Sequence, residues 1–101
     1  MVGGTVLAPR GVMPAGHAPY RTIGPFDDGS LPAGLRAEHR LKAGTWALLT
    51  VTAGAIRFVW DDEQGGATDL AAPASLIVPE LVPHHVESDG PFSLTIAFHQ
   101  A

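Results

Sequence analysis

The chain contains no cysteine, and this absence removes several kinds of site. No disulfide, thiolate-bound metal or cysteine nucleophile can form, so any metal ion must be held by nitrogen and oxygen atoms. Charge is also sparse, because Lys, Arg, Asp and Glu make up only 16% of the residues, whereas about a quarter is usual. A small domain with so little charge has apolar surface to bury, so we expect a homodimer.

Basic residues are few, and they form no run along the chain. The formal net charge is -4, which argues against nucleic acid as the main partner, because phosphate binding needs a basic surface. Long apolar runs are missing too, so no membrane-spanning segment is expected. The N-terminal residues lack the basic start of a secretory signal, and a cytoplasmic protein is the expectation.

What the sequence does contain is a series of short apolar runs separated by Gly, Pro and Asp. Residues 1–19 show no period and predict an irregular N-terminal tail, so that one domain spans residues 20–101. The predicted strands are Tyr20–Ile23, Leu35–Leu41, Trp46–Thr52, Ala55–Trp60, Thr68–Ala71, Ser75–Val78, Pro83–Ser88 and Phe92–His99. No window indicates a helix, and this spacing predicts an all-β sandwich or barrel.

Five histidines are candidate metal ligands, because imidazole is the commonest nitrogen ligand in proteins. Alternation around His39 places it with Leu35, Ala37 and Leu41 on an apolar face, whereas its charged neighbours point the other way. A buried imidazole there needs a partner, which could be a backbone carbonyl, a water molecule or a metal ion. His17 lies in the predicted tail and is discounted as a ligand.

His84 follows a corner made by Pro79 and Pro83, which returns the chain to the sheet. The segment Pro79–His84 resembles the second cupin motif, Pro-x-Gly-x-x-His, in its proline and its histidine. Leu81 departs from the motif, because it stands where the motif has glycine.

The first cupin motif is matched only in part. That motif has two histidines one residue apart, then a glutamate, then a glycine. His39 fits the first histidine and Gly54 fits the glycine approximately, but Leu41 stands in place of the second histidine and Trp46 stands near the glutamate. The general cupin metal site is therefore half missing.

A longer resemblance runs from about Tyr20 to the end of the chain. It is carried by short segments in a fixed order: Leu31–Leu35, His39–Trp46, Val51–Gly54, Phe58–Asp61, Val78–Pro79, His84–Glu87 and Phe92–Phe98. In order and spacing they resemble the tellurite-resistance TehB/YeaR-like family of small cupins. The resemblance implies a cupin-like jelly-roll barrel, or double-stranded β-helix, with a bound divalent transition metal. Zinc is the first expectation, and iron, manganese and nickel are the alternatives.

The resemblance also implies the ligands: His39, His84 and Glu87, which matches an acidic position in the family. Alternation puts Glu87 on the face opposite His84, together with His85, so only a β-bulge would bring it round. The alternative for Glu87 is a surface ion pair with Arg40 or Lys42. The third ligand therefore stays open among Glu87, His85, His99 and water.

Three functions are compatible with these residues. The first is a metal-binding cupin that senses or processes a small molecule, linked to tellurite or other oxyanion stress or to reactive-nitrogen stress. The second is a metal-dependent enzyme of the dioxygenase or isomerase class, and the third is a non-catalytic dimerising module with a vestigial site. The incomplete first motif favours the first and third. Trp46 and Trp60 are interpreted as core or interface aromatics rather than as a platform for a ligand.

Overall fold

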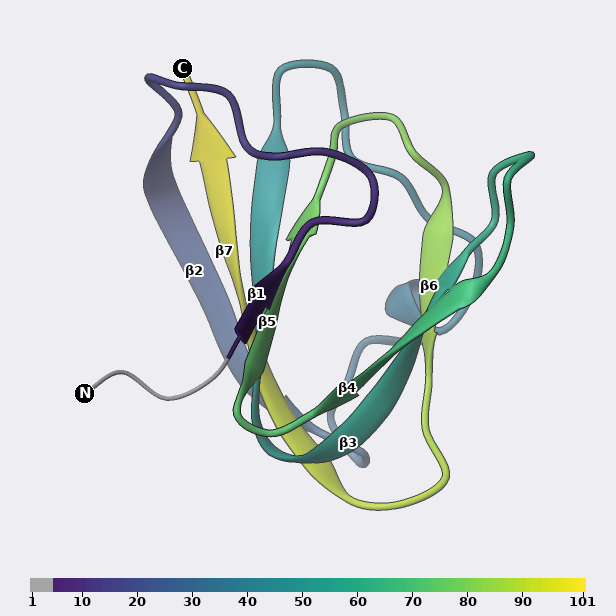
Figure 1. The fold of residues 1–101 in the computed structure, drawn as a ribbon. Coiled ribbons are helices and arrows are strands. Elements are labelled where there is room, and N and C mark those ends of the chain that lie inside the picture. The colour runs from purple at the N-terminus through teal and green to yellow at the C-terminus, as the bar shows by residue number, and fades with distance from the viewer. Residues whose placement is uncertain (1–4) are drawn as a thin grey trace.

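One long strand, β3 (Trp46–Trp60), organises residues 5–101, the part of the chain that the computed structural model describes (Figure 1). The other strands are β1 (Thr5–Leu7), β2 (Ala18–Asp27), β4 (Ala67–Ala71), β5 (Ala74–Val78), β6 (His84–Glu87) and β7 (Phe92–Gln100). A short 3-10 turn, η1, spans Ala33–Leu35. Residues 5–101 contain no helix long and apolar enough to cross a membrane. The prediction of an all-β chain is confirmed.

Strand β3 takes part in two sheets because it bends in the middle. Its first half pairs with β5 and β7, in a sheet ordered β1-β5-β3-β7-β2, and its second half pairs with β4 and β6. Figure 1 shows these two layers facing each other, with β3 passing from one to the other at the lower end. Within residues 5–101, β1 pairs only with β5 and β2 only with β7, so the sheet keeps open edges and does not close into a barrel.

The bend of β3 depends on a glycine. The register with β7 shifts between Val51 and Ala53, and Gly54 follows with a φ of 68°. A Cβ atom at Gly54 would overlap the carbonyl oxygen of Pro91, so the close approach of the two backbones requires glycine here.

The facing sides of the two sheets enclose a single apolar core. Alternate residues point inward along the strands, as the pattern of buried and half-buried residues in β3, β5 and β7 shows. The largest fully buried side chains are Phe58, Leu70, Leu76, Leu94 and Val51. Burial of each such side chain stabilises the fold by roughly 1.5–3 kcal/mol, so the core does not depend on polar groups.

The strand predicted at Leu35–Leu41 does not form. Leu35 ends η1, where its amide donates to the carbonyl of Pro32 at 2.9 Å, and only His39 later pairs with a strand, as a single bridge to His84. The segment has no neighbouring strand along the rest of its length, so alternation alone could not make it a strand. The predicted orientation holds for Leu41, which is buried, and for His39, but Ala37 is exposed.

Two other predictions differ from the structure. Trp46–Thr52 and Ala55–Trp60 are one continuous strand, because Ala53 and Gly54 form a bend within it rather than a turn. The predicted irregular tail, residues 1–19, contains β1, which pairs in parallel with β5, and the start of β2. Residues 1–4 lie outside the described part of the chain.

Candidate functional site

His39 and His84 lie in a cavity of about 40 Å³ between the two sheets. Its other lining residues are apolar: Ile23, Leu31, Leu35, Leu41, Ala47, Leu49, Phe58, Val78, Val86, Leu94, Ile96 and Phe98. A space of this size has room for one ion with a water molecule or two, but not for a large organic substrate.

Backbone pairing fixes the two histidines relative to each other. His84 begins β6, opposite Trp60 of β3, and forms the bridge to His39. The amide of His39 donates to the carbonyl of His84, and the amide of His84 donates to the carbonyl of His39, both at 2.8 Å. The two ring centroids are 5.5 Å apart, with the ring planes at 81°. The predicted pair is therefore brought together on the core side of the sheets.

The environment of His84 sets its protonation state. Its Nδ1 lies 2.8 Å from the carbonyl oxygen of Val82 and donates to it, which leaves Nε2 without a proton in the neutral ring. Only 5% of His84 is exposed, its ring stacks on Phe58 with centroids 4.9 Å apart, and burial lowers its pKa to about 4. A neutral imidazole whose Nδ1 is held by a carbonyl is the form that binds a metal through Nε2.

The cavity contains two imidazoles as nitrogen donors, and its other lining residues supply no further metal ligand. Within residues 5–101, no hydrogen bond is made to Nε2 of His84, and no cluster of three or more His, Cys, Asp or Glu side chains is arranged to hold a metal ion. The chain thus offers two nitrogen donors, and a four-coordinate ion there needs water or a bound molecule at its other positions.

Glu87 and His85 lie on the opposite face of β6, as alternation predicts. His85 Nδ1 is 2.7 Å from Asp61 Oδ2, and His85 Nε2 is 2.7 Å from Glu87 Oε2. These two carboxylates, Asp61 first and then Glu87, raise the pKa of His85. The structure therefore pairs Glu87 with His85, rather than with Arg40 or Lys42, and does not bring it to His39 and His84.

His99 and His17 lie away from the cavity as well. His99 is opposite Trp46 in the ladder of β3 and β7, on the outer face of the first sheet, and the ring of His17 meets the edge of Trp46 with centroids 6.4 Å apart. Trp46 is half-buried, whereas Trp60 belongs to the core, as interpreted from the sequence.

Sequence reasoning missed the role of Glu80. Its carboxylate accepts from the amide of Gly44 at 2.9 Å and from Trp46 Nε1 at 3.3 Å, which ties the corner before His84 to the start of β3. The position is an unspecified one in the second cupin motif, so the motif gave no signal for it.

Leu81, which stands where the second cupin motif has glycine, has a backbone conformation that favours glycine. Leu81 has a φ of 63°, and it is the one non-glycine residue with positive φ in the described part of the chain. Its amide donates to the carbonyl of Leu41 at 2.9 Å. The corner needs a left-handed residue, which glycine adopts without strain.

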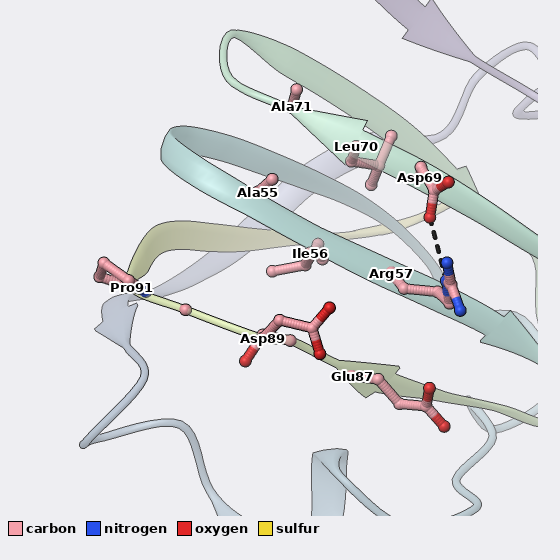
Figure 2. Close-up of a pocket in the computed structure, with 11 residues that line it drawn as sticks. Ala55, Ile56, Arg57, Asp69, Leu70, Ala71, Glu87, Asp89 and Pro91 are labelled. Carbon is pink, nitrogen blue, oxygen red and sulfur yellow. Dashed lines mark hydrogen bonds and ion pairs between the residues drawn. The ribbon is translucent and has the colours of Figure 1, made fainter.

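A larger groove of about 440 Å³ lies on the second sheet, beside the loop from β6 to β7. Figure 2 shows Ile56 and Leu70 within it and four charged side chains around it: Arg57, Asp69, Glu87 and Asp89. Arg57 Nε pairs with Asp69 Oδ1 at 3.1 Å, which raises the pKa of Arg57, but both side chains are mostly exposed. The groove contains no histidine, so the smaller histidine cavity remains the candidate site.

Comparison with known protein families gives one assignment. A family model described as the TehB-like domain matches residues 21–96. Among functionally curated proteins, no sequence matches the chain.

Solved structures share the fold. TehB from Haemophilus influenzae superposes with a TM-score of 0.75 at 24% identity, over 83% of this chain and 31% of that chain. A protein from Escherichia coli K12 superposes with a TM-score of 0.76 at 22% identity, over 89% of this chain and 96% of the other. A structure of Fe(II)-HppE with the alternative substrate (S)-1-HPP has a TM-score of 0.51 at 28% identity, over 60% of this chain and 33% of that one. The chain thus spans less than a third of the length of TehB.

Proposed function

The chain belongs to the TehB-like domain family, and on that premise we propose that it is a small metal-binding cupin. In this proposal its two facing sheets are an open form of the jelly roll, or double-stranded β-helix. The observation that carries the proposal is the pairing of His39 and His84, whose rings lie 5.5 Å apart in an otherwise apolar cavity. An apolar wall around two imidazoles leaves few other partners for their free nitrogens.

The proposed occupant is a divalent transition metal, with zinc preferred and iron, manganese and nickel as alternatives, since imidazole suits each of them. Nε2 of His84 and a ring nitrogen of His39 would hold it, and water or a small ligand would complete its coordination. For Glu87 to be the third ligand, its side chain would have to leave His85 and cross to the other face of β6. Bound metal would supply an electrophilic centre for a small molecule.

We link this site to the sensing or processing of a small molecule under tellurite, other oxyanion or reactive-nitrogen stress, in a cytoplasmic homodimer. The link rests on the family resemblance. The chain matches only 31% of the H. influenzae TehB chain, so the activity of that longer protein is an inference for this one. The size of the cavity, about 40 Å³, supports a small ligand.

A metal-dependent enzyme is the second candidate. The Fe(II)-HppE structure, which resembles this fold over 60% of the chain, contains iron. Non-haem iron oxygenases commonly hold their metal with two histidines and one carboxylate. Within the described residues the cavity is lined by no carboxylate, so the binding function is preferred over this one.

The experiment that tests the metal site is a comparison of metal content after growth with added zinc, iron and manganese. The parent should hold one metal ion per chain. His39→Ala or His84→Ala should weaken zinc binding by about tenfold or more, because each substitution removes one of the two protein ligands. His17→Ala, His85→Ala and Glu87→Gln should keep the metal, because these side chains lie outside the cavity.

Three results would count against the proposal. A parent protein without metal would remove the site, and equal metal content in all variants would show that the metal binds elsewhere. Loss of metal in Glu87→Gln alone would make Glu87 a ligand and would require a rearranged β6. The usual imidazole pKa would place the loss of zinc below about pH 6, but the lowered pKa of His84, about 4, moves proton competition at that ligand toward pH 4.

A further inference from the structure

We infer that Arg21 forms an anion-binding position at the rim of the histidine cavity, so that the site takes a small anion rather than a neutral molecule or a cation. This inference rests on the proposed metal site and adds to it the charge class of the ligand and a residue that selects it.

The register of the first sheet places Arg21 on the cavity side. Arg21 is opposite Phe98, Phe98 is opposite Ala47, and Ala47 is opposite Val78, so the four residues form one row across the sheet. Residues directly opposite each other in an antiparallel ladder point to the same face. Phe98, Ala47 and Val78 all line the cavity that contains His39 and His84. The side chain of Arg21 therefore leaves β2 on that same face.

Arg21 stands at the edge of this row. β2 is an edge strand that pairs only with β7 among the described residues, and Arg21 itself is exposed. Next to it, the ladder has a register irregularity between Pro19 and Arg21, although Pro19 still pairs with His99 of β7. By this register the side chain of Arg21 leaves an exposed edge strand on the side of the sheet that bears the cavity.

Arg21 also differs from the other arginines of the chain. Arg10, Arg40 and Arg57 pair with carboxylates, and Arg36 donates to the carbonyl of Asp28. Arg21 makes no ion pair or side-chain hydrogen bond within residues 5–101. Its donors remain available to a ligand, and a guanidinium binds a carboxylate or an inorganic oxyanion through two parallel hydrogen bonds.

Metal and guanidinium would act together on the ligand. A metal ion on His39 and His84 carries positive charge, and Arg21 adds a second positive charge on the same side of the sheet. Two positive groups beside an apolar wall favour an anion. The cavity volume of about 40 Å³ restricts the part that enters to a few atoms, such as an inorganic oxyanion or a carboxylate group.

The test compares Arg21→Ala, Arg21→Lys and the parent, each titrated with sulfate and with acetate and followed by backbone amide chemical shifts. In the zinc-loaded protein, Arg21→Ala should weaken anion binding by about tenfold or more and leave zinc affinity within about threefold, because the residue contacts the anion and not the metal. Arg21→Lys should retain part of the affinity, since it keeps the charge but loses the paired donors. A preference for sulfate indicates an inorganic oxyanion, and a preference for acetate indicates a carboxylate.

Arg57→Ala is the matched control, because Arg57 is another exposed arginine but lies on the second sheet and pairs with Asp69. It should leave anion binding unchanged. If Arg21→Ala binds both anions as tightly as the parent, or if the parent binds neither at tens of millimolar, the inference is wrong. A parent that holds no zinc overturns the proposed metal site instead, and the same titration of the metal-free protein then decides the role of Arg21 separately.

Discussion

His84 and His85 are adjacent in the sequence, yet the sheet gives them opposite chemical properties. His84 points into the core, where burial lowers its pKa to about 4. His85 points outward between Asp61 and Glu87, which raise its pKa. Alternation along a strand is thus enough to place one imidazole in the core and its neighbour in a surface charge network.

We predict that proton NMR of the metal-free protein will show these two histidines titrating on opposite sides of the usual value of about 6.5. The midpoint of His84 should be near 4, and that of His85 above 6.5. Asp61→Asn should lower the midpoint of His85, because it removes the main partner of Nδ1. Two midpoints near 6.5 would contradict the assigned environments.

The same shifts predict opposite effects on stability. Below about pH 6.5, His84 takes up a proton in the unfolded chain, whereas its imidazole stays neutral in the folded protein. The free energy of unfolding therefore decreases by roughly 3 kcal/mol as the pH is lowered from 6.5 to 4. His85 contributes stability that is present below pH 6.5 and is lost as the pH rises through its raised pKa. Urea denaturation across this range, compared with His84→Gln, would isolate the first effect, and an unchanged pH dependence in that variant would contradict it.

Leu81 provides a second prediction at this scale. A leucine with a φ of 63° is strained by roughly 1–2 kcal/mol, but Leu81 is only 50% exposed, so its removal also loses about half of a leucine's burial, roughly 1 kcal/mol. Leu81→Gly should therefore leave the free energy of unfolding within about 1 kcal/mol of the parent, because the relieved strain is offset by the lost burial and by the greater flexibility of glycine in the unfolded chain. Thermal denaturation measures this, with Val12→Gly as a control at an exposed residue without positive φ. A loss of more than about 1 kcal/mol would mean that Leu81 makes packing contacts that outweigh its strain.

Strands could be predicted from the sequence where apolar and polar residues alternate clearly. They could not be predicted where long-range contacts determine the conformation of the chain. β5, β6 and β7 lie close to their predicted bounds, because their inward residues alternate with outward ones. The segment before β2 has no such pattern. It is fixed by Arg10, which pairs with Asp62 at 2.8 Å and lies over the ring of Trp60 at 4.7 Å, contacts that join residues fifty or more positions apart.

The proximity of His39 and His84 could also be predicted, but not the groups around them. His39 was marked by its apolar neighbours and His84 by the proline corner before it. The orientation of the His84 ring depends on its hydrogen bond to the carbonyl of Val82. A contact to a backbone group cannot be predicted from the pattern of side chains. Arg21 lies in a short regular part of β2 between two irregularities, and its pairing with Phe98 of β7, which fixes its face, is a long-range contact.

The bend of β3 gives the prediction at the scale of an element. Gly54→Ala should destabilise the protein by about 2 kcal/mol or more, because it combines a left-handed backbone with a clash against the carbonyl of Pro91. Gly65→Ala is the control, since Gly65 has nearly the same φ of 65° but no atom within 4 Å of the added methyl group. It should be destabilised by about 1–2 kcal/mol from the backbone alone. Urea denaturation compares the two, and equal losses would show that the approach of Pro91 is not what requires glycine.

At the scale of the whole molecule, the outer face of the first sheet carries fewer charged residues than is usual for a surface in contact with solvent. The inner face is apolar because it meets the second sheet. The outer face also lacks Asp, Glu, Lys and Arg along three rows of paired residues: Pro19, His99 and Trp46; Thr22, Ala97, Leu48 and Ile77; and Thr95, Thr50 and Ser75. Most of these side chains are half-buried in the single chain. Depletion of charge is a property of the centre of protein interfaces, so this face is the one expected to meet a second copy.

We therefore predict a homodimer that forms through the outer face of the first sheet. An average interface buries about 800 Å² per partner, which is a modest share of the 5488 Å² of accessible surface of one chain. Light scattering on the purified protein should give twice the chain mass of 10.5 kDa. Leu48→Asp should give a monomer with an unchanged circular dichroism spectrum, because it places a charge at the centre of the face without entering the core. Val59→Asp, on the outer face of the second sheet, should remain dimeric. A parent protein that stays monomeric at micromolar concentration and above would exclude the dimer, and a dimer broken equally by both substitutions would place the interface elsewhere.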